Sequence, residues 1–330
     1  MRVLVTGGCG YIGSALVPRL QESHVVSEIS VLDNLSTGSP ANLAAADLGG
    51  ADLSFQEGDV REYGAVEAAV RDVDAVVHLA AITGAESTYD RAAETRAVNR
   101  DGTENILKAA RKFDVERVVF ASSCNNYGRA EARDIDETVE PDPINPYARA
   151  KYESEQLLAE YADDYGMETT ALRMSTNYGY APGVRFNLVV NTFVFRALTG
   201  RPLTVYGDGS NWRPFVHVED AARSFLDATT RPGQWPERVY NVGATDGNYR
   251  IEEVADIVDA ELDRELEISY LREKQPGPSY HVNFDRLEET GFELRRSLPE
   301  GITDLAARFG SKNHAHDGGH ATVGGRETDV

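Results

Sequence analysis

VLVTGGCGYIG, residues 3–13, is the stretch that decides the fold. An apolar run leads into a glycine-rich turn and an amphipathic segment follows, which predicts a strand, a tight turn and a helix in this order. Glycines are needed in such a turn because the backbone must touch a pyrophosphate, and a Cβ would hold it off. The pyrophosphate would lie on the free amides at the start of the helix. The residues predicted to contact a dinucleotide here are Gly7, Gly10, Tyr11, Ile12 and Gly13.

A second apolar strand is predicted over residues 29–32, and it ends in Asp33, twenty residues after Gly13. A carboxylate at this point of a dinucleotide-binding fold accepts both hydroxyls of the adenosine ribose and repels a 2′-phosphate. Asp33 therefore favours NAD over NADP as the cofactor. An ordinary surface aspartate that closes a strand is the simpler alternative.

Strands and helices alternate through the first half of the chain. Further strands are predicted at 54–55, 75–79, 117–121 and 169–172, and helical segments at 65–70, 91–111 and 147–165. This alternation is typical of a parallel sheet, so we expect an α/β fold with a doubly wound parallel sheet, of the Rossmann type, over residues 1–175. His78 lies in one of these strands and is interpreted as a buried, hydrogen-bonded histidine rather than a catalytic group.

After residue 175, strands and helices alternate less clearly. This pattern predicts a smaller C-terminal lobe over residues 176–310 that covers the carboxyl edge of the sheet and binds the substrate, with some segments returning to the sheet. Residues 311–330 lack apolar periodicity and are expected to be a disordered tail.

The charge balance excludes several classes of partner. The chain has 33 basic and 54 acidic residues and a net charge of -21, which repels nucleic acids and anionic membrane surfaces. Only 5 of the basic residues are lysine, and such an acidic, lysine-poor surface resembles that of proteins from salt-loving organisms, in which salt screens the self-repulsion. We therefore expect stability to depend on salt.

Neither a membrane span nor a metal centre is expected. Mean hydropathy is -0.40 and no window approaches eighteen apolar residues, so the cytoplasm is the expected compartment. Cys9 and Cys124 cannot form a disulfide framework or a zinc site, and both are expected to be free thiols.

Tyr147 and Lys151 form a Y-x-x-x-K pair on the helix predicted over residues 147–165, after a proline-rich loop. Residues at i and i+4 face the same side of a helix. An ammonium beside a phenol, with a positive nicotinamide nearby, stabilises the phenolate and lowers its pKa toward the range of a general base. The spacing also occurs in helices without any such function.

These motifs occur together in one order and spacing. They are residues 7–13, Asp33-Asn34, Asp59-Val60, residues 78–81, Ser123 four residues before Tyr127-Gly128, and Tyr147 with Lys151. In this order the chain resembles the extended short-chain dehydrogenase/reductase family, and within it the NAD-dependent sugar epimerases and dehydratases. The resemblance covers roughly residues 1–310 and implies both a Rossmann fold and NAD.

The resemblance also implies roles for individual residues. Ser123 would hydrogen-bond the reacting hydroxyl, Tyr147 would take its proton, and Lys151 would hold the nicotinamide ribose. The residues implied to lie along the cofactor are Asn34, Asp59, Val60, Leu79, Ala80, Ala81 and Asn99.

For the substrate, Arg213 resembles the arginine that grips a nucleotide-sugar diphosphate, a task suited to its bidentate fork. Asn187 resembles a phosphate ligand and Asn125 lies beside the reacting group. The family usually has asparagine where Thr176 stands. It often has a second arginine in the C-terminal part as well, and Arg272 matches that arginine only if the alignment is shifted by one residue. These departures put the diphosphate grip in doubt, and Arg213 could instead pair with a surface acid.

The favoured function is NAD-dependent epimerisation of a nucleotide sugar, with C4 as the expected carbon, by a homodimer that pairs through the helices at 91–111 and 147–165. The alternative is an NAD-dependent dehydrogenase of a free sugar, of the aldose 1-dehydrogenase type, that releases NADH. A non-catalytic NAD-sensing scaffold would leave Ser123, Tyr147 and Lys151 unexplained. Dehydration is disfavoured because Cys124-Asn125 stands where the 4,6-dehydratases carry Asp-Glu.

Overall fold

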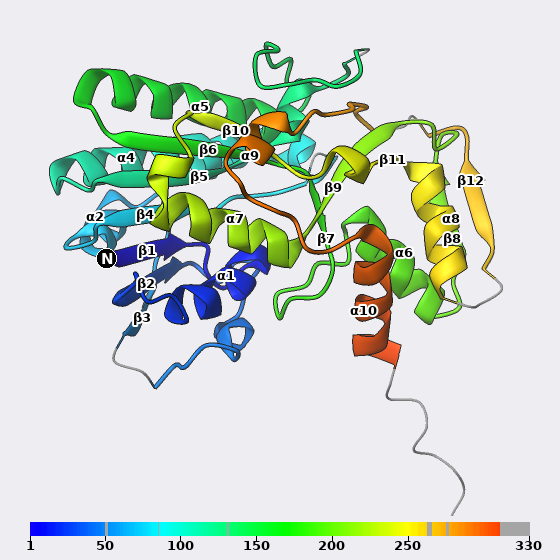
Figure 1. Ribbon diagram of the computed structural model, residues 1–330, viewed down its shortest axis with the longest axis horizontal. Helices are drawn as coiled ribbons and strands as arrows, with labels where there is room; N and C mark the ends of the chain where they lie inside the picture. Colours follow the sequence, from blue (N-terminus) through cyan, green and yellow to red (C-terminus); the bar gives the residue numbers. More distant parts are fainter. Residues whose placement is uncertain (50–51, 85, 131, 263–265, 275–276, 311–330) are drawn as a thin grey trace, which may run out of the picture.

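The computed structural model describes residues 1–49, 52–84, 86–130, 132–262, 266–274 and 277–310. A large sheet with helices on both faces forms one part of the molecule, and a smaller lobe of helices and short strands lies at one end of it (Figure 1). The tail expected at 311–330 lies outside the described residues. None of the helices in the described ranges is both long and apolar enough to cross a membrane.

The large sheet has seven strands, and every neighbouring pair is parallel. The strands are β1 (Arg2–Thr6), β2 (Glu28–Asp33), β3 (Leu53–Glu57), β4 (Ala75–His78), β5 (Arg117–Ser123), β6 (Glu168–Met174) and β10 (Val239–Val242). Their order is β10-β6-β5-β4-β1-β2-β3, so the direction of winding reverses between β1 and β4. A crevice opens at the carboxyl ends of the strands at such a reversal, and the expected doubly wound parallel sheet is confirmed.

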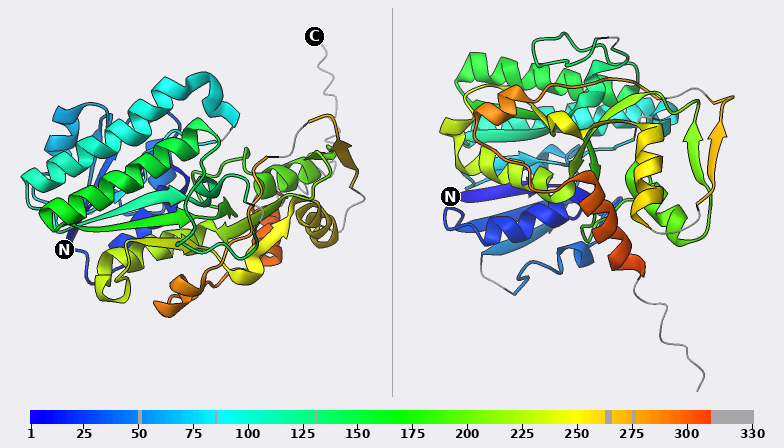
Figure 2. Two further views of the ribbon diagram at one scale, coloured as in Figure 1. Left: turned by 90° about the horizontal axis from the view of Figure 1, so that it is seen from above. Right: turned by 45° about the vertical axis from the view of Figure 1, so that its right-hand side comes forward.

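Helices cover the sheet on both faces, as seen from above in Figure 2. On one face α1 (Tyr11–Gln21) packs against α7 (Val218–Thr230). On the other face lie α2 (Tyr63–Val70), α4 (Gly102–Lys112) and α5 (Pro146–Tyr165). Each face has its own apolar core, the first including Leu16 and Phe225 and the second Ile106 and Leu158, so the strands between them are buried on both sides.

The single helix predicted over residues 91–111 is wrong in its interior. The structure has α3 (Ala92–Arg96), a π-helical turn (Ala97–Asp101) and then α4. The π turn widens the helix at Asn99, and the freed Asn99 carbonyl accepts hydrogen bonds from Thr103 Oγ1 at 2.6 Å and Ser154 Oγ at 3.0 Å. The segments on either side of the π turn each keep a helical pattern, which is why the sequence predicted one regular helix.

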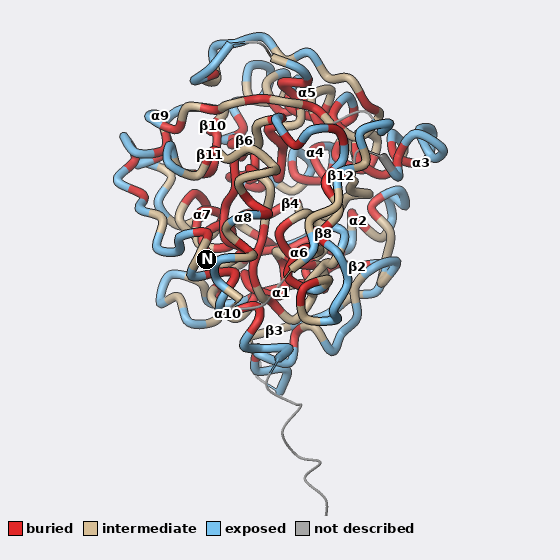
Figure 3. Tube along the Cα trace, turned by 90° about the vertical axis from the view of Figure 1, so that its right-hand side faces the viewer, coloured by how far each residue is buried: buried red, intermediate tan, exposed pale blue. Residues whose placement is uncertain are grey.

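The described residues of the smaller lobe form nine strands and α-helices. They are β7 (Thr176–Tyr178), α6 (Val189–Leu198), β8 (Leu203–Tyr206), β9 (Trp212–His217), β11 (Asn248–Arg250), α8 (Ile251–Glu261), β12 (Ile268–Leu271), α9 (Asp285–Glu289) and α10 (Leu298–Gly310), of which α9 contacts β10 of the large sheet. The strands form a three-stranded sheet, β11-β9-β7, and a parallel pair, β12-β8. Phe193, Val254 and Leu305 join α6, α8 and α10 in a third core. Buried segments run through the middle of the molecule in Figure 3.

Candidate active site

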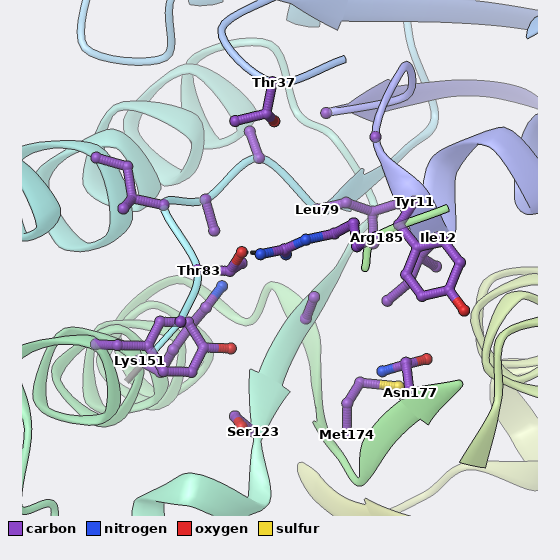
Figure 4. A pocket seen from close by; sticks show the side chains of 18 of the residues that line it. Tyr11, Ile12, Thr37, Leu79, Thr83, Ser123, Lys151, Met174, Asn177 and Arg185 are labelled. Carbon is purple, nitrogen blue, oxygen red and sulfur yellow. Dashed lines mark hydrogen bonds between the residues drawn. The ribbon is translucent and has the colours of Figure 1, made fainter. Parts of the chain in front are cut away.

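A cavity of about 460 Å³ lies where the carboxyl ends of the large sheet meet the smaller lobe, and both parts of the chain line it (Figure 4). The first part contributes the glycine-rich turn, the ends of β2, β4 and β5, and the start of α5. The second contributes residues of β7, β9 and the loop before α6. Of the residues predicted for the site, those in the lining are Gly7, Gly10, Tyr11, Ile12, Gly13, Asp33, Asn34, Val60, Leu79, Ala80, Ala81, Ser123, Asn125, Tyr147, Lys151, Thr176, Asn187 and Arg213.

The glycine-rich turn fits a bound diphosphate. Gly7 has a φ of +71°, and a Cβ added there would lie 2.7 Å from the backbone nitrogen of Ala80. A Cβ at Gly13 would lie 2.5 Å from the carbonyl oxygen of Gly8. Gly10 is the N-cap of α1 and has no capping side chain, so the first-turn amides of this helix have no acceptor within it. These donors lie in the cavity wall, where an anion can accept from them.

Asp33 ends β2 in the wall of the cavity, and two backbone amides hold its carboxylate in place. Oδ2 accepts from the amide of Cys9 at 2.9 Å and Oδ1 from the amide of Leu35 at 2.8 Å. Each carboxylate oxygen has a second lone pair, so both can still accept from ribose hydroxyls. Asn34 lies beside it and donates to Asp59 Oδ2 at 2.9 Å.

Two residues expected along the cofactor do not line the cavity. Asp59 pairs with Arg61, whose Nη2 lies 2.7 Å from Oδ2, and this hydrogen bond lowers the pKa of the carboxyl to about 2. Asn99 is fully buried and forms two hydrogen bonds of 2.8 Å with the backbone of Ile82, one to its amide and one to its carbonyl. Asp59 and Asn99 therefore support the lining residues Asn34 and Ile82 from behind.

Ser123, Tyr147 and Lys151 converge on the cavity from β5 and α5. The start of α5 is encoded locally: Asn145 caps it by accepting from the amide of Ala148 at 2.9 Å, and proline occupies its first turn. Figure 4 shows Ser123 and Lys151 at this cavity, and Tyr147 precedes Lys151 by one turn of α5.

The pKa values at this centre depend on burial. Burial raises the pKa of the Tyr147 phenol, while a hydrogen bond with Ser123 and the positive charge of Arg185 act to lower it. This direction is opposite to the one expected from the Tyr147–Lys151 spacing alone. Burial lowers the pKa of Lys151 to about 7, against the attraction of Glu155, and its Nζ lies 4.5 Å from the centre of the Phe120 ring. Lys151 therefore changes protonation near neutral pH.

A fully buried polar network lies behind Ser123. Glu155, one turn after Lys151 on α5, accepts from Arg173 Nη2 at 2.7 Å and also from Ser122 and from Asn126. Arg173 Nη1 donates to the hydroxyl of Tyr127 at 2.8 Å. Because Glu155 and Arg173 are buried and paired, this network fixes the end of β5 against α5.

His78 and Cys124 are structural. His78 Nδ1 lies 2.6 Å from Thr6 Oγ1 and Nε2 lies 3.0 Å from Thr103 Oγ1, and burial lowers its pKa to about 3, so the neutral form bridges two elements. The prediction of a buried, hydrogen-bonded histidine is confirmed. Cys124 is buried, and its thiol donates to the carbonyl of Arg173 at 3.2 Å.

The lobe contributes Thr176, Asn187 and Arg213 to the lining. Arg213 forms no ion pair with an acid of the described residues; its guanidinium donates to the carbonyl of Pro278 and lies 4.7 Å from the centre of the Tyr280 ring. Arg272 is exposed and lies outside the lining, so the second arginine considered from the sequence is not in the cavity.

Sequence reasoning missed two polar lining residues of the lobe, Asn177 and Arg185. Asn177, next to Thr176, has a buried amide oxygen without a hydrogen-bond partner. Arg185 reaches across the cavity and donates to the hydroxyl of Thr83. A signal for Asn177 was present: the family usually has asparagine where Thr176 stands, and this chain has an asparagine at the next position. Nothing in the spacing around Arg185 indicated its position.

Comparisons with known proteins agree with this geometry. The family model for the NAD dependent epimerase/dehydratase family matches residues 3–243. The low-salt glycan biosynthesis protein Agl12 of Haloferax volcanii is 31% identical over 304 residues, which cover 92% of this chain and 96% of that protein.

Two solved structures have the same fold and similar sequences. The structure of Thermus thermophilus UDP-glucose 4-epimerase in complex with NAD has 31% identity and a TM-score of 0.81, and the match covers 94% of this chain and all of that one (100%). The dTDP-glucose 4,6-dehydratase DesIV of Streptomyces venezuelae, with NAD and TYD bound, has 30% identity and a TM-score of 0.82, covering 93% and 97%. The chain belongs to the NAD-dependent epimerase/dehydratase family of extended short-chain dehydrogenases/reductases and is an enzyme that uses NAD.

Proposed function

We propose that the protein epimerises a nucleotide sugar at C4. The observation that carries this proposal is the convergence of Ser123, Tyr147 and Lys151 on a cavity that also contains Arg213. NAD, when bound, supplies an acceptor and then a donor of hydride. Tyr147 takes the proton of the reacting hydroxyl and returns it, and Ser123 hydrogen-bonds that hydroxyl so that it faces the phenol.

Lys151 assists by electrostatics. With a pKa of about 7 it is partly protonated at neutral pH, and its charge then stabilises the phenolate of Tyr147 and binds ribose hydroxyls. Arg213 supplies a fork for the diphosphate of the nucleotide, which a protein with a net charge of -21 would otherwise repel.

The residues that line the cavity argue against dehydration. Eliminating water requires an acid and a base beside the sugar. The carboxylates in the described lining are Asp33, at the end of β2, and Glu94, which pairs with Arg91 through Arg91 Nε at 2.9 Å. Cys124 is buried away and its thiol is already engaged, which leaves Asn125 without an acidic neighbour at this position.

Oxidation of a free sugar is the second candidate, and the contacts of Arg213 favour it. The guanidinium already donates to the carbonyl of Pro278, and Arg272 lies outside the cavity. A free sugar needs no diphosphate grip, and the same Ser123, Tyr147 and Lys151 would release NADH in each turnover.

One experiment separates the two candidates. The protein is incubated with NAD and a panel of free and nucleotide sugars while absorbance at the reduced-nicotinamide band is followed, and UDP binding is measured by calorimetry. Epimerisation gives no net absorbance change and an epimeric product, and UDP binds. NADH accumulation with a free sugar, together with no UDP binding at millimolar concentration, would replace the epimerase with the sugar dehydrogenase.

The protein is also proposed to be a cytoplasmic homodimer adapted to salt. The outer faces of α4 and α5 would pair across a two-fold axis; they carry Tyr165, which is 46% exposed. Sedimentation in high salt should give a dimer mass at micromolar concentration, and a monomer mass would exclude the dimer.

Unfolding measured against KCl concentration tests the salt requirement. Equal stability without added salt would contradict it.

A further inference from the structure

The charges that line the cavity are unevenly paired. Five cationic side chains occur in the described lining: Arg61, Arg91, Lys151, Arg185 and Arg213. Arg61 and Arg91 each pair with a carboxylate, Asp59 and Glu94. Lys151, Arg185 and Arg213, in contrast, have no carboxylate of the described residues within 4.0 Å, and burial lowers the pKa of Arg185 below its usual range. A half-buried cation without a counter-charge points to an anion that arrives with a ligand.

The backbone around Arg185 is fastened to the glycine-rich turn. The amide of Gly183 donates to Ser14 Oγ at 3.0 Å, and a Cβ at Gly183 would lie 2.7 Å from the carbonyl of Gly10. The side-chain amide of Asn191 bonds the carbonyl of Arg185 at 3.0 Å and the hydroxyl of Tyr11 at 3.2 Å. These contacts bring a segment from the second half of the chain onto the turn where α1 begins.

The side chain of Arg185 then runs across the cavity. In Figure 4 it extends from beside Ile12 and Leu79 toward Thr83, and its guanidinium donates to the hydroxyl of Thr83. It therefore runs from the glycine-rich turn toward the part of the cavity that Tyr147 and Lys151 line. The diphosphate and the nicotinamide ribose of NAD occupy this interval if the turn and Lys151 have the roles given above.

The turn itself provides no positive side chain. Its lining residues are glycines, Tyr11 and Ile12, and the first turn of α1 contains no basic residue. The amide donors of the turn carry only partial charge, whereas the diphosphate carries two full negative charges and the protein as a whole is at -21. A nearby guanidinium would supply the missing attraction.

We propose that Arg185 binds the diphosphate of NAD as a strap that closes over the cofactor from the second half of the chain. Thr83 orients the guanidinium across the cavity, and the contacts of Gly183 and Asn191 hold its backbone on the turn. Arg185 is then a cofactor-binding residue. Of the two arginines that the lobe contributes to the lining, only Arg213 binds the substrate.

The test is the affinity of Arg185→Met for NAD, for ADP-ribose and for UDP, measured by titration calorimetry at one fixed salt concentration. Methionine keeps much of the length and removes the charge. NAD and ADP-ribose should bind roughly tenfold to thirtyfold more weakly, as expected for the loss of a charge-assisted, partly buried contact, while UDP binding should be unchanged. Arg185→Lys should recover part of the loss. Arg201→Met, the same change at an exposed arginine after α6, is the matched control and should bind all three normally.

Other results decide against the proposal. NAD and ADP-ribose affinities within about twofold of the unmodified protein would overturn it, and so would a loss confined to UDP, which would assign Arg185 to the substrate. If circular dichroism shows that Arg185→Met does not fold, Thr83→Val keeps the charge and removes its anchor. Thr83→Val should weaken NAD binding about twofold to threefold, and an unchanged NAD affinity would then overturn the proposal. None of these readouts depends on which sugar the enzyme converts.

Discussion

The two walls of the cavity differ in how far their charged groups are compensated before a ligand is present. In the wall from the large sheet, Glu155 and Arg173 behind Ser123 compensate each other's charge, although Asn126 beside them has a buried amide oxygen without a partner among the described residues. In the wall from the lobe, Asn177 has a buried oxygen without a partner and Arg185 lacks a carboxylate among the described residues. The first wall is preorganised for chemistry, whereas the second is built to be completed by a ligand.

The largest expected effect tests the chemical wall. Tyr147→Phe should lower kcat by a factor on the order of 10² to 10⁴, because the ring still packs but the proton acceptor is gone. NAD affinity should remain close to that of the unmodified protein. Tyr165→Phe, at the exposed far end of the same helix, is the control for kcat and calorimetry. A Tyr147→Phe enzyme with half its activity would remove Tyr147 from the mechanism.

The next effect tests the ligand-binding wall. Arg213→Ala should raise KM for the nucleotide sugar about 30-fold or more, the equivalent of roughly 2 kcal/mol or above, with NAD affinity unchanged. If the protein is a dehydrogenase of a free sugar, Arg213→Ala affects only packing and should raise KM far less. Arg272→Ala, at an exposed arginine outside the cavity, serves as control. A larger loss from Arg272 than from Arg213 would show that the alignment slips by one residue.

A pair of asparagines sharpens the comparison directly. Asn177→Ala should weaken substrate or cofactor binding about fivefold, near the net value of one hydrogen bond, and should change the melting temperature little. Asn191→Ala removes an amide that bonds Gly179, Tyr11 and Arg185 and should lower the melting temperature by several degrees. Thermal unfolding and calorimetry on both variants test this. Equal melting temperatures would mean that the hydrogen-bonded Asn191 stabilises the fold no more than Asn177 does.

A further expected effect is a pH dependence of stability. Because the pKa of Lys151 falls from 10.5 to about 7 on folding, the unfolded chain binds more protons between these values. The free energy of unfolding therefore gains a contribution that rises with pH across this window. Lys151→Met should lose this rise and, without added NAD, be more stable than the unmodified protein at pH 7. Unfolding curves from pH 7 to 10 measure it, with Lys108→Met, at an exposed lysine, as control. An identical slope in Lys151→Met would contradict the lowered pKa.

The sequence predicted the chemical wall better than the ligand-binding wall for a physical reason. Asp33 follows a strand directly, and Tyr147 and Lys151 share a helix, so local spacing is enough to bring them to the sheet edge. Arg185 meets Thr83 across 102 positions of sequence, and only the packing of the lobe on the glycine-rich turn brings them together. Asn177 was overlooked because short strand β7 places adjacent residues, 176 and 177, in the lining.

The π turn at Ala97–Asp101 makes this cavity sensitive to the length of the chain as well as to its chemistry. Each residue of an α-helix turns the next by about 100°, so a deletion of one residue between 92 and 98 that restored a regular helix would rotate the amide of Asn99 away from Ile82. The loop after β4 would then lose its two hydrogen bonds to Asn99. A single-codon deletion in this helix is thus more damaging to the site than most substitutions on its surface.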